Sequence, residues 1–262
     1  MFSDLDYCQP LRWIIIFIVI HKNKENNLIM KNEAILNDVN ELKNTKKAFI
    51  IYMIGEICQI IGMLSMGANY KFLPRWLETF AFFSLIGYFL ILVALCLIRK
   101  LHKTFTYSLI TVGILSTLML FAEVCSTSNE YIYIAWGKGL TWTNDVLLCI
   151  VHIYFFQGCI FLFRKYKDEK MEKDVKWVAI IYFIIFAVFM VFKIGTYIPS
   201  ILKNTVANRV FVYGSILFEL VSYVYVMVNV VRIAIRINLI RKEEDHEIGE
   251  IEATTSEDQG VL

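Results

Sequence analysis

Ionisable side chains interrupt several long apolar segments of the sequence, and these are the residues best suited to chemistry. Glu56, His152 and Glu219 each lie well inside such a segment. A charged side chain at the centre of a bilayer costs about 2.5–3.5 kcal/mol on insertion scales, so it needs a function or a pairing partner. Two facing carboxylates at this depth would hold a proton or a cation, because both cannot ionise cheaply in low dielectric. The three residues therefore predict an intramembrane proton or cation site, with hydrogen bonding between helices as the structural alternative.

Further polar side chains lie at helical spacing from these ionisable groups. Gln59 follows Glu56 by three residues on the same helix face, and Ser222 and Asn229 continue the stripe of Glu219. A metal ion held by the acids and the histidine is the lesser alternative, so no metal ligand, catalytic residue or cofactor is assigned. The complete candidate site is Glu56, Gln59, His152, Gln157, Glu219, Ser222 and Asn229.

Two glycines, Gly55 and Gly62, flank the face that carries Glu56. Small residues let neighbouring helices approach closely in a membrane. We therefore expect this face to pack against another helix.

Glu123 and Lys193 stand near the ends of two other apolar segments. Both lie within about one turn of the same predicted membrane face, where long charged side chains can extend toward the lipid headgroups. They are predicted to form an outer-end charge pair or to extend in this way. Either arrangement is structural.

The elements that must position these residues are transmembrane helices. Hydrophobic residues make up 58% of the 262-residue chain and charged residues only 19%, a balance shifted from soluble proteins toward lipid. A spanning helix needs about 20 mostly apolar residues, and the apolar runs are continuous rather than alternating, which favours helices over barrel strands. The predicted fold is all-α with six transmembrane helices. Their predicted bounds are 48–68, 79–98, 105–125, 146–163, 177–197 and 210–231.

The distribution of Lys and Arg predicts the orientation of these helices. The segments 22–47, 99–104, 164–176 and 232–242 together carry 19 basic residues, whereas the alternate loops carry 5. Loops rich in Lys and Arg remain in the cytoplasm. The sequence therefore predicts that both termini are cytoplasmic.

The chain outside the six-helix domain, which covers 48–236, consists of short segments. Residues 1–29 are interpreted as an over-called start, with translation beginning at Met30, or as an interfacial segment. Residues 30–47 have the pattern of a cytoplasmic amphipathic helix. The tail, 237–262, contains eight acids in its last 20 residues and no Lys or Arg among them, which favours disorder.

These features predict a multi-pass protein of the transport class, either a small permease or the membrane subunit of a transporter. The layout is similar to that of small six-helix exporter permeases, but no motif names a family. The alternative is a non-enzymatic membrane sensor, immunity factor or assembly factor that acts through a partner protein. One histidine and two acids are too few groups for an intramembrane enzyme, so no enzymatic activity is predicted.

The expected partners are the lipid bilayer and a separate energy-coupling or signalling subunit, and a homo-oligomer is a further option. The net charge of +2 gives no sign of nucleic-acid binding. A chain rich in Ile, Lys and Asn without a glycosylation sequon fits a bacterial plasma membrane.

Cysteine-accessibility mapping tests the predicted topology. Single cysteines introduced near the two ends of the chain should both react with an impermeant reagent only from the cytoplasmic side, because the basic loops hold that side. Labelling of the two ends from opposite sides would contradict six spans with both termini inside.

Overall fold

The structure is a computed structural model that describes residues 41–62, 64, 82–128, 130–198, 201 and 203–259. Within these residues, the side chains at 122–141, 244, 245 and 247–259 are not described. Regular structure in the described ranges is helical throughout and contains no strand, as the predicted all-α class requires. The predicted segments at 1–29 and 30–40 lie outside the described residues.

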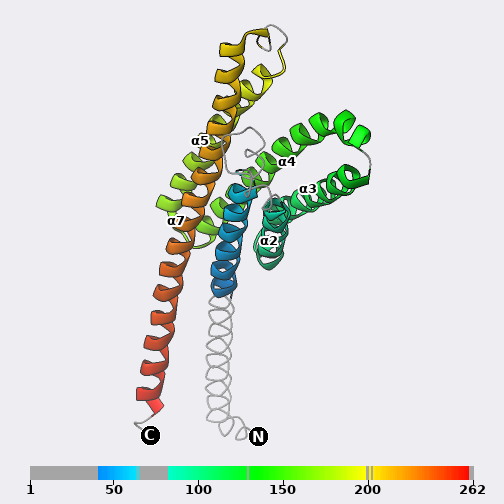
Figure 1. The fold of residues 1–262 in the computed structure, drawn as a ribbon. Helices are drawn as coiled ribbons and strands as arrows, with labels where there is room; N and C mark the ends of the chain where they lie inside the picture. The colour runs from blue at the N-terminus through cyan, green and yellow to red at the C-terminus, as the bar shows by residue number, and fades with distance from the viewer. Residues whose placement is uncertain are drawn as a thin grey trace, which may run out of the picture. The chain divides into compact units, whose positions relative to one another are not determined.

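The described chain is a succession of helices (Figure 1). Four of them contain stretches that are long and apolar enough to cross a membrane, and these stretches lie in α3, α4, α5 and α7. The helices are 41–62, α2 (Phe83–Ile98), α3 (Lys103–Ser128), α4 (Glu130–Lys165), α5 (Glu169–Gly195) and α7 (Thr205–Gln259).

Two of the six predicted spans are not among these four stretches. The span predicted at 79–98 corresponds to α2, which has 16 residues, whereas a crossing needs about 20. The span predicted at 48–68 corresponds to the helix over 41–62, and most residues that follow it lie outside the description. The structure therefore supports four crossings by length and composition.

Two segments that were not expected to be transmembrane are also helical. The predicted loop between 126 and 145 is mostly occupied by the end of α3 and the beginning of α4. The helix α7 also continues through most of the predicted tail, to Gln259. The tail has no proline, so no residue in it removes a backbone donor from the helix.

The chain divides into two compact units, one formed by 1–43 and 238–262 and the other by residues 44–237. All the contacts described below lie within the second unit.

The second unit places apolar side chains outside and many polar side chains inside. Trp177 and Val191 are 64% and 62% exposed, whereas Glu56 and His152 are 0% and 1% exposed. Soluble proteins rarely expose large continuous apolar surfaces, so this distribution indicates a protein whose surroundings are lipid.

Small residues bring the helix over 41–62 into close contact with α2. A Cβ atom added to Gly87 would lie 2.7 Å from the backbone oxygen of Gly55, and one added to Gly62 would lie 2.7 Å from the backbone nitrogen of Ser84. Gln59, between the two glycines, donates a hydrogen bond from Nε2 to the Ser84 carbonyl oxygen at 3.0 Å. This contact confirms the expectation that Gly55 and Gly62 mark a helix interface.

The helix α4 packs against both α3 and α5. The Ser108 hydroxyl on α3 donates a hydrogen bond to the Val151 carbonyl oxygen on α4 at 2.9 Å. Two turns further along α4, the ring of Phe105 fills the space where a side chain at position 158 would lie. These contacts fix the face of α4 that carries His152.

A tight turn joins α4 to α5. Lys167 has φ +55°, and the Asp168 side chain then caps α5 by accepting a hydrogen bond from the Met171 backbone N–H. Asp168 also accepts a hydrogen bond from Arg236 on α7. Partial burial alone would raise the pKa of the Asp168 carboxyl, but Arg236 and the Met171 amide together lower it below its usual value. The contact therefore stabilises the fold above the usual titration range of aspartate and is lost as the pH falls through the lowered pKa.

Replacing Gly87 with Ala tests the contact between the helix 41–62 and α2. The added methyl group would overlap the Gly55 carbonyl, so we expect a loss of about 1–3 kcal/mol of stability, seen as a lower thermal midpoint in mild detergent. Gly113→Ala is the matched control, since nothing lies within 4 Å of the added atom there. Equal stability of the two variants would contradict the contact.

Candidate functional site

Three buried side chains from three helices form a continuous hydrogen-bonded chain. Glu56 comes from the helix over 41–62, His152 from α4 and Tyr182 from α5. The Glu56 Oε1 atom lies 2.9 Å from His152 Nε2, and the Tyr182 hydroxyl oxygen lies 2.7 Å from His152 Nδ1. All three side chains are buried, with exposures of 0%, 1% and 2%. The imidazole therefore bridges a carboxyl group and a phenol in a region shielded from solvent.

This chain can exist in two arrangements that differ by one proton. With Glu56 ionised, His152 Nε2–H donates to the carboxylate and the Tyr182 hydroxyl donates to Nδ1. With Glu56 protonated at Oε1, the carboxyl O–H donates to Nε2, and Nδ1–H then donates to the Tyr182 oxygen. Gain or loss of a proton would thus change the histidine tautomer and the direction of both hydrogen bonds.

The second oxygen of the Glu56 carboxyl group is buried and has no hydrogen-bond partner among the described residues. The Tyr52 hydroxyl, one turn earlier on the same helix, is in the same condition. The Tyr52 ring stacks on Phe155 with centroids 4.2 Å apart and meets the His152 ring edge-on at 6.4 Å. A buried polar atom without a partner costs roughly 1–3 kcal/mol. A proton on the Glu56 oxygen, or a water molecule beside either atom, would therefore be stabilising.

A second buried group of charges involves α4, α5 and α7. Lys193 on α5 pairs with Asp145 on α4, and the two side chains are only 13% and 7% exposed. Asp145 and Lys193 are also the charged residues that act on the Glu219 carboxyl group of α7. Tyr88 on α2 donates a hydrogen bond to the Asn144 side-chain oxygen at 2.9 Å, next to this pair. The second acid of the candidate site is therefore half-buried and within electrostatic range of the Lys193 pair.

The remaining residues of the candidate site lie apart from the Glu56–His152 chain. Gln59 is buried and bonds to α2, whereas Gln157 is exposed. The Ser222 hydroxyl bonds to the Glu219 carbonyl oxygen, and the Asn229 side chain bonds to a carbonyl oxygen one turn earlier, so both satisfy their own helix. Of the seven residues, only Glu56 and His152 are joined by a hydrogen bond from one side chain to another.

The predicted charge pair of Glu123 and Lys193 remains a prediction. The side chain of Glu123 is not described, and Lys193 has Asp145 as a partner.

Tyr182 and Asp145 are the site residues that the sequence pattern did not identify. Asp145 lies one residue before the predicted span 146–163, although α4 begins at Glu130 and carries Asp145 well inside the helix. Tyr182 is apolar enough not to interrupt the predicted span 177–197, and the available signal was a hydroxyl group near the start of that span. Aromatic residues with a polar tip usually find a hydrogen-bond partner when buried.

No family model matches the chain, and searches of curated proteins and of solved structures likewise find no match. No group of three or more His, Cys, Asp or Glu residues able to hold a metal ion is found in the part of the chain that the structure describes. The described chain is thus defined by its own features. It is helical, four of its helices are apolar enough to cross a membrane, and Glu56 and His152 form a hydrogen bond in its interior.

A double-mutant cycle tests the partner of Lys193. Asp145→Asn and Lys193→Met should each lower the stability by up to about 3–5 kcal/mol, because each leaves a buried charge unpaired, and the double variant should lose less than the sum. The measurement is thermal unfolding in mild detergent. The same cycle with Glu123→Gln should be additive with Lys193→Met. Coupling to Glu123 in place of Asp145 would contradict the pairing described above.

Proposed function

We propose that the protein is a transport-class membrane protein with six spans and both termini in the cytoplasm, in which Glu56, His152 and Tyr182 form a proton-binding site. It would act as a small permease or as the membrane subunit of a transporter in a plasma membrane. In each transport cycle Glu56 would gain and lose one proton, and the hydrogen bonds of His152 and Tyr182 would reverse direction between the protonated and the ionised form of Glu56.

The observation that carries this proposal is the state of the Glu56 carboxyl group. It is fully buried, one oxygen bonds to His152, and the other has no partner among the described residues. A carboxylate in such surroundings is stabilised by taking up a proton, whereas the bond from the imidazole stabilises its ionised form. These opposing effects suit a group that must both bind and release a proton.

The ligands at the site favour a proton over a metal cation. Glu56 offers one carboxyl group, and its described side-chain partner is the imidazole of His152 rather than a second oxygen ligand. Hard cations such as calcium take six to eight oxygen ligands, commonly carboxylates and carbonyls. A proton needs only a donor and an acceptor.

Proton flux into proteoliposomes is the functional test. The purified full-length protein is reconstituted with a trapped pH-sensitive dye, and a potassium diffusion potential drives protons inward. The wild-type protein should acidify the lumen faster than empty liposomes, and Glu56→Gln should reduce the rate to that of empty liposomes because the amide cannot carry the proton. Tyr182→Phe should slow the flux, since it removes one hydrogen bond of the chain.

Glu172→Gln is the matched control, because this acid pairs with Arg164 and Lys176 at the start of α5, away from the buried chain. Its flux should equal that of the wild type. Each variant must elute as a single species in mild detergent. Equal flux through the wild type and Glu56→Gln would rule out the proposed proton site.

A second candidate function is a sensor, immunity factor or assembly factor acting through a partner protein. The helical continuation of α7 to Gln259 favours it, because an acidic helix offers a partner a defined surface. Deletion of 243–262 should then abolish capture of a partner in mild detergent, while Glu56→Gln should have no effect on that capture. The two functions thus respond to different variants.

A further inference from the structure

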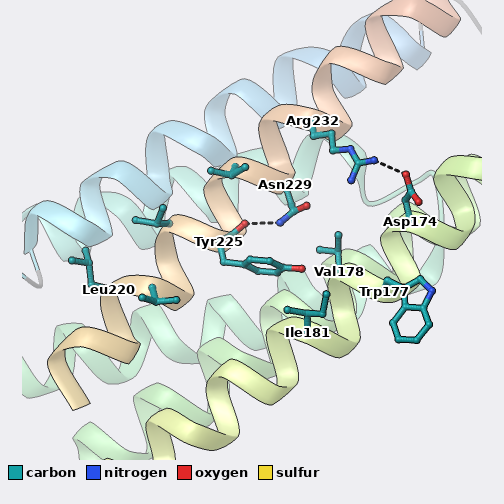
Figure 2. A pocket seen from close by; sticks show the side chains of 11 residues that line it. Asp174, Trp177, Val178, Ile181, Leu220, Tyr225, Asn229 and Arg232 are labelled. Atoms are coloured by element: carbon teal, nitrogen blue, oxygen red, sulfur yellow. Dashed lines mark hydrogen bonds and ion pairs between the residues drawn. The ribbon is translucent and has the colours of Figure 1, made fainter. Parts of the chain in front are cut away.

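A groove of about 690 Å³ lies between α5 and α7 on the outside of the second unit. Its walls are mainly branched aliphatic side chains, among them Val178, Ile181 and Val224. The polar groups gather toward one end, where Arg232 on α7 pairs with Asp174 on α5 (Figure 2). The groove is therefore apolar along its length and charged at its end.

The length of the groove corresponds to one leaflet of a bilayer. Leu220 lines one end and Arg232 the other, and twelve residues of α-helix extend about 18 Å. The hydrocarbon core of a bilayer is about 30 Å thick, so one leaflet accounts for about half of that distance. A groove of this length can accommodate most of one acyl chain.

The charged end lies at the depth expected for lipid headgroups. Arg232 directly follows the predicted span 210–231, and Asp174 precedes the predicted span 177–197. Trp177, which is 64% exposed, lines the groove near this end, and tryptophan is enriched at membrane–water interfaces. Lys173 and Lys176 lie beside Asp174 and are exposed, and Lys176 pairs with Glu172. Lys173 therefore adds a basic side chain near this end.

We infer that the groove between α5 and α7 binds one anionic phospholipid, with an acyl chain along the aliphatic walls and the phosphate beside Arg232. The acyl chain covers the aliphatic walls of the groove, which no described side chain fills. Arg232 supplies N–H donors to the phosphate. Asp174 orients the guanidinium group across the end of the groove (Figure 2). Assignment of the lipid to the cytoplasmic leaflet rests on the proposed orientation, whereas the binding itself does not.

Native mass spectrometry in mild detergent tests this site. The full-length protein is mixed with equal amounts of dioleoylphosphatidylglycerol and dioleoylphosphatidylcholine, and the lipid retained per chain is measured. The wild type should retain one phosphatidylglycerol with a preference of about fivefold over phosphatidylcholine. Arg232→Gln should abolish the preference, and Arg209→Gln, an exposed arginine at the other end of α7, should keep it.

A variant that fills the groove tests where the acyl chain lies. Val224→Trp places an indole in the groove and should abolish retention of both lipids, whereas Val210→Trp, on the same helix but outside the groove, should retain them. Val221→Trp serves the same purpose if Val224→Trp does not elute as a single species. Unchanged retention in the filled variants would overturn the inference. Conversion of a dimer to a monomer by these variants would also overturn it, because the groove would then bind a second copy of the chain.

Discussion

The contact between Glu56 and His152 is the interaction on which the interior of this protein depends. An isolated carboxylate in an apolar interior is costly, and the penalty is removed only by a proton or by a donor such as the His152 N–H. The partners lie on helices far apart in sequence, so the bond fixes how the helix over 41–62 faces α4. Tyr182 extends the same constraint to α5. The titratable group and the geometry of three helices are thus coupled directly.

Close helix packing makes this contact possible. Gly55 and Gly87 remove the side chains that would separate the helix over 41–62 from α2, and Gln59 then bonds to the backbone of α2. Phe49 and Tyr52 pack against Phe155 on α4. With little gain from the hydrophobic effect between helices in lipid, such close packing and interior hydrogen bonds must hold the bundle together. The same physics leaves aliphatic side chains outside, including the walls of the α5–α7 groove.

The sequence was sufficient to predict helices, apolar spans and the burial of Glu56, Gln59 and His152, because these follow from local composition and from the cost of burying polar groups. It could not pair Glu56 with His152 in preference to Glu219, because pairing depends on how helices rotate against each other. It also missed Asp145, because hydropathy places the start of a span and not the start of the helix.

Infrared difference spectroscopy of the reconstituted protein between acidic and alkaline pH tests the titration of Glu56 most directly. A carboxyl group that gains a proton in an apolar environment shows a carbonyl band that shifts in heavy water and is separate from the bands of ionised carboxylates. If the buried chain binds a proton at Glu56, the band appears reversibly in the wild type, disappears in Glu56→Gln and persists in Glu172→Gln. An identical band in the wild type and in Glu56→Gln would show that Glu56 does not titrate, and the proposed role of the buried chain would be wrong.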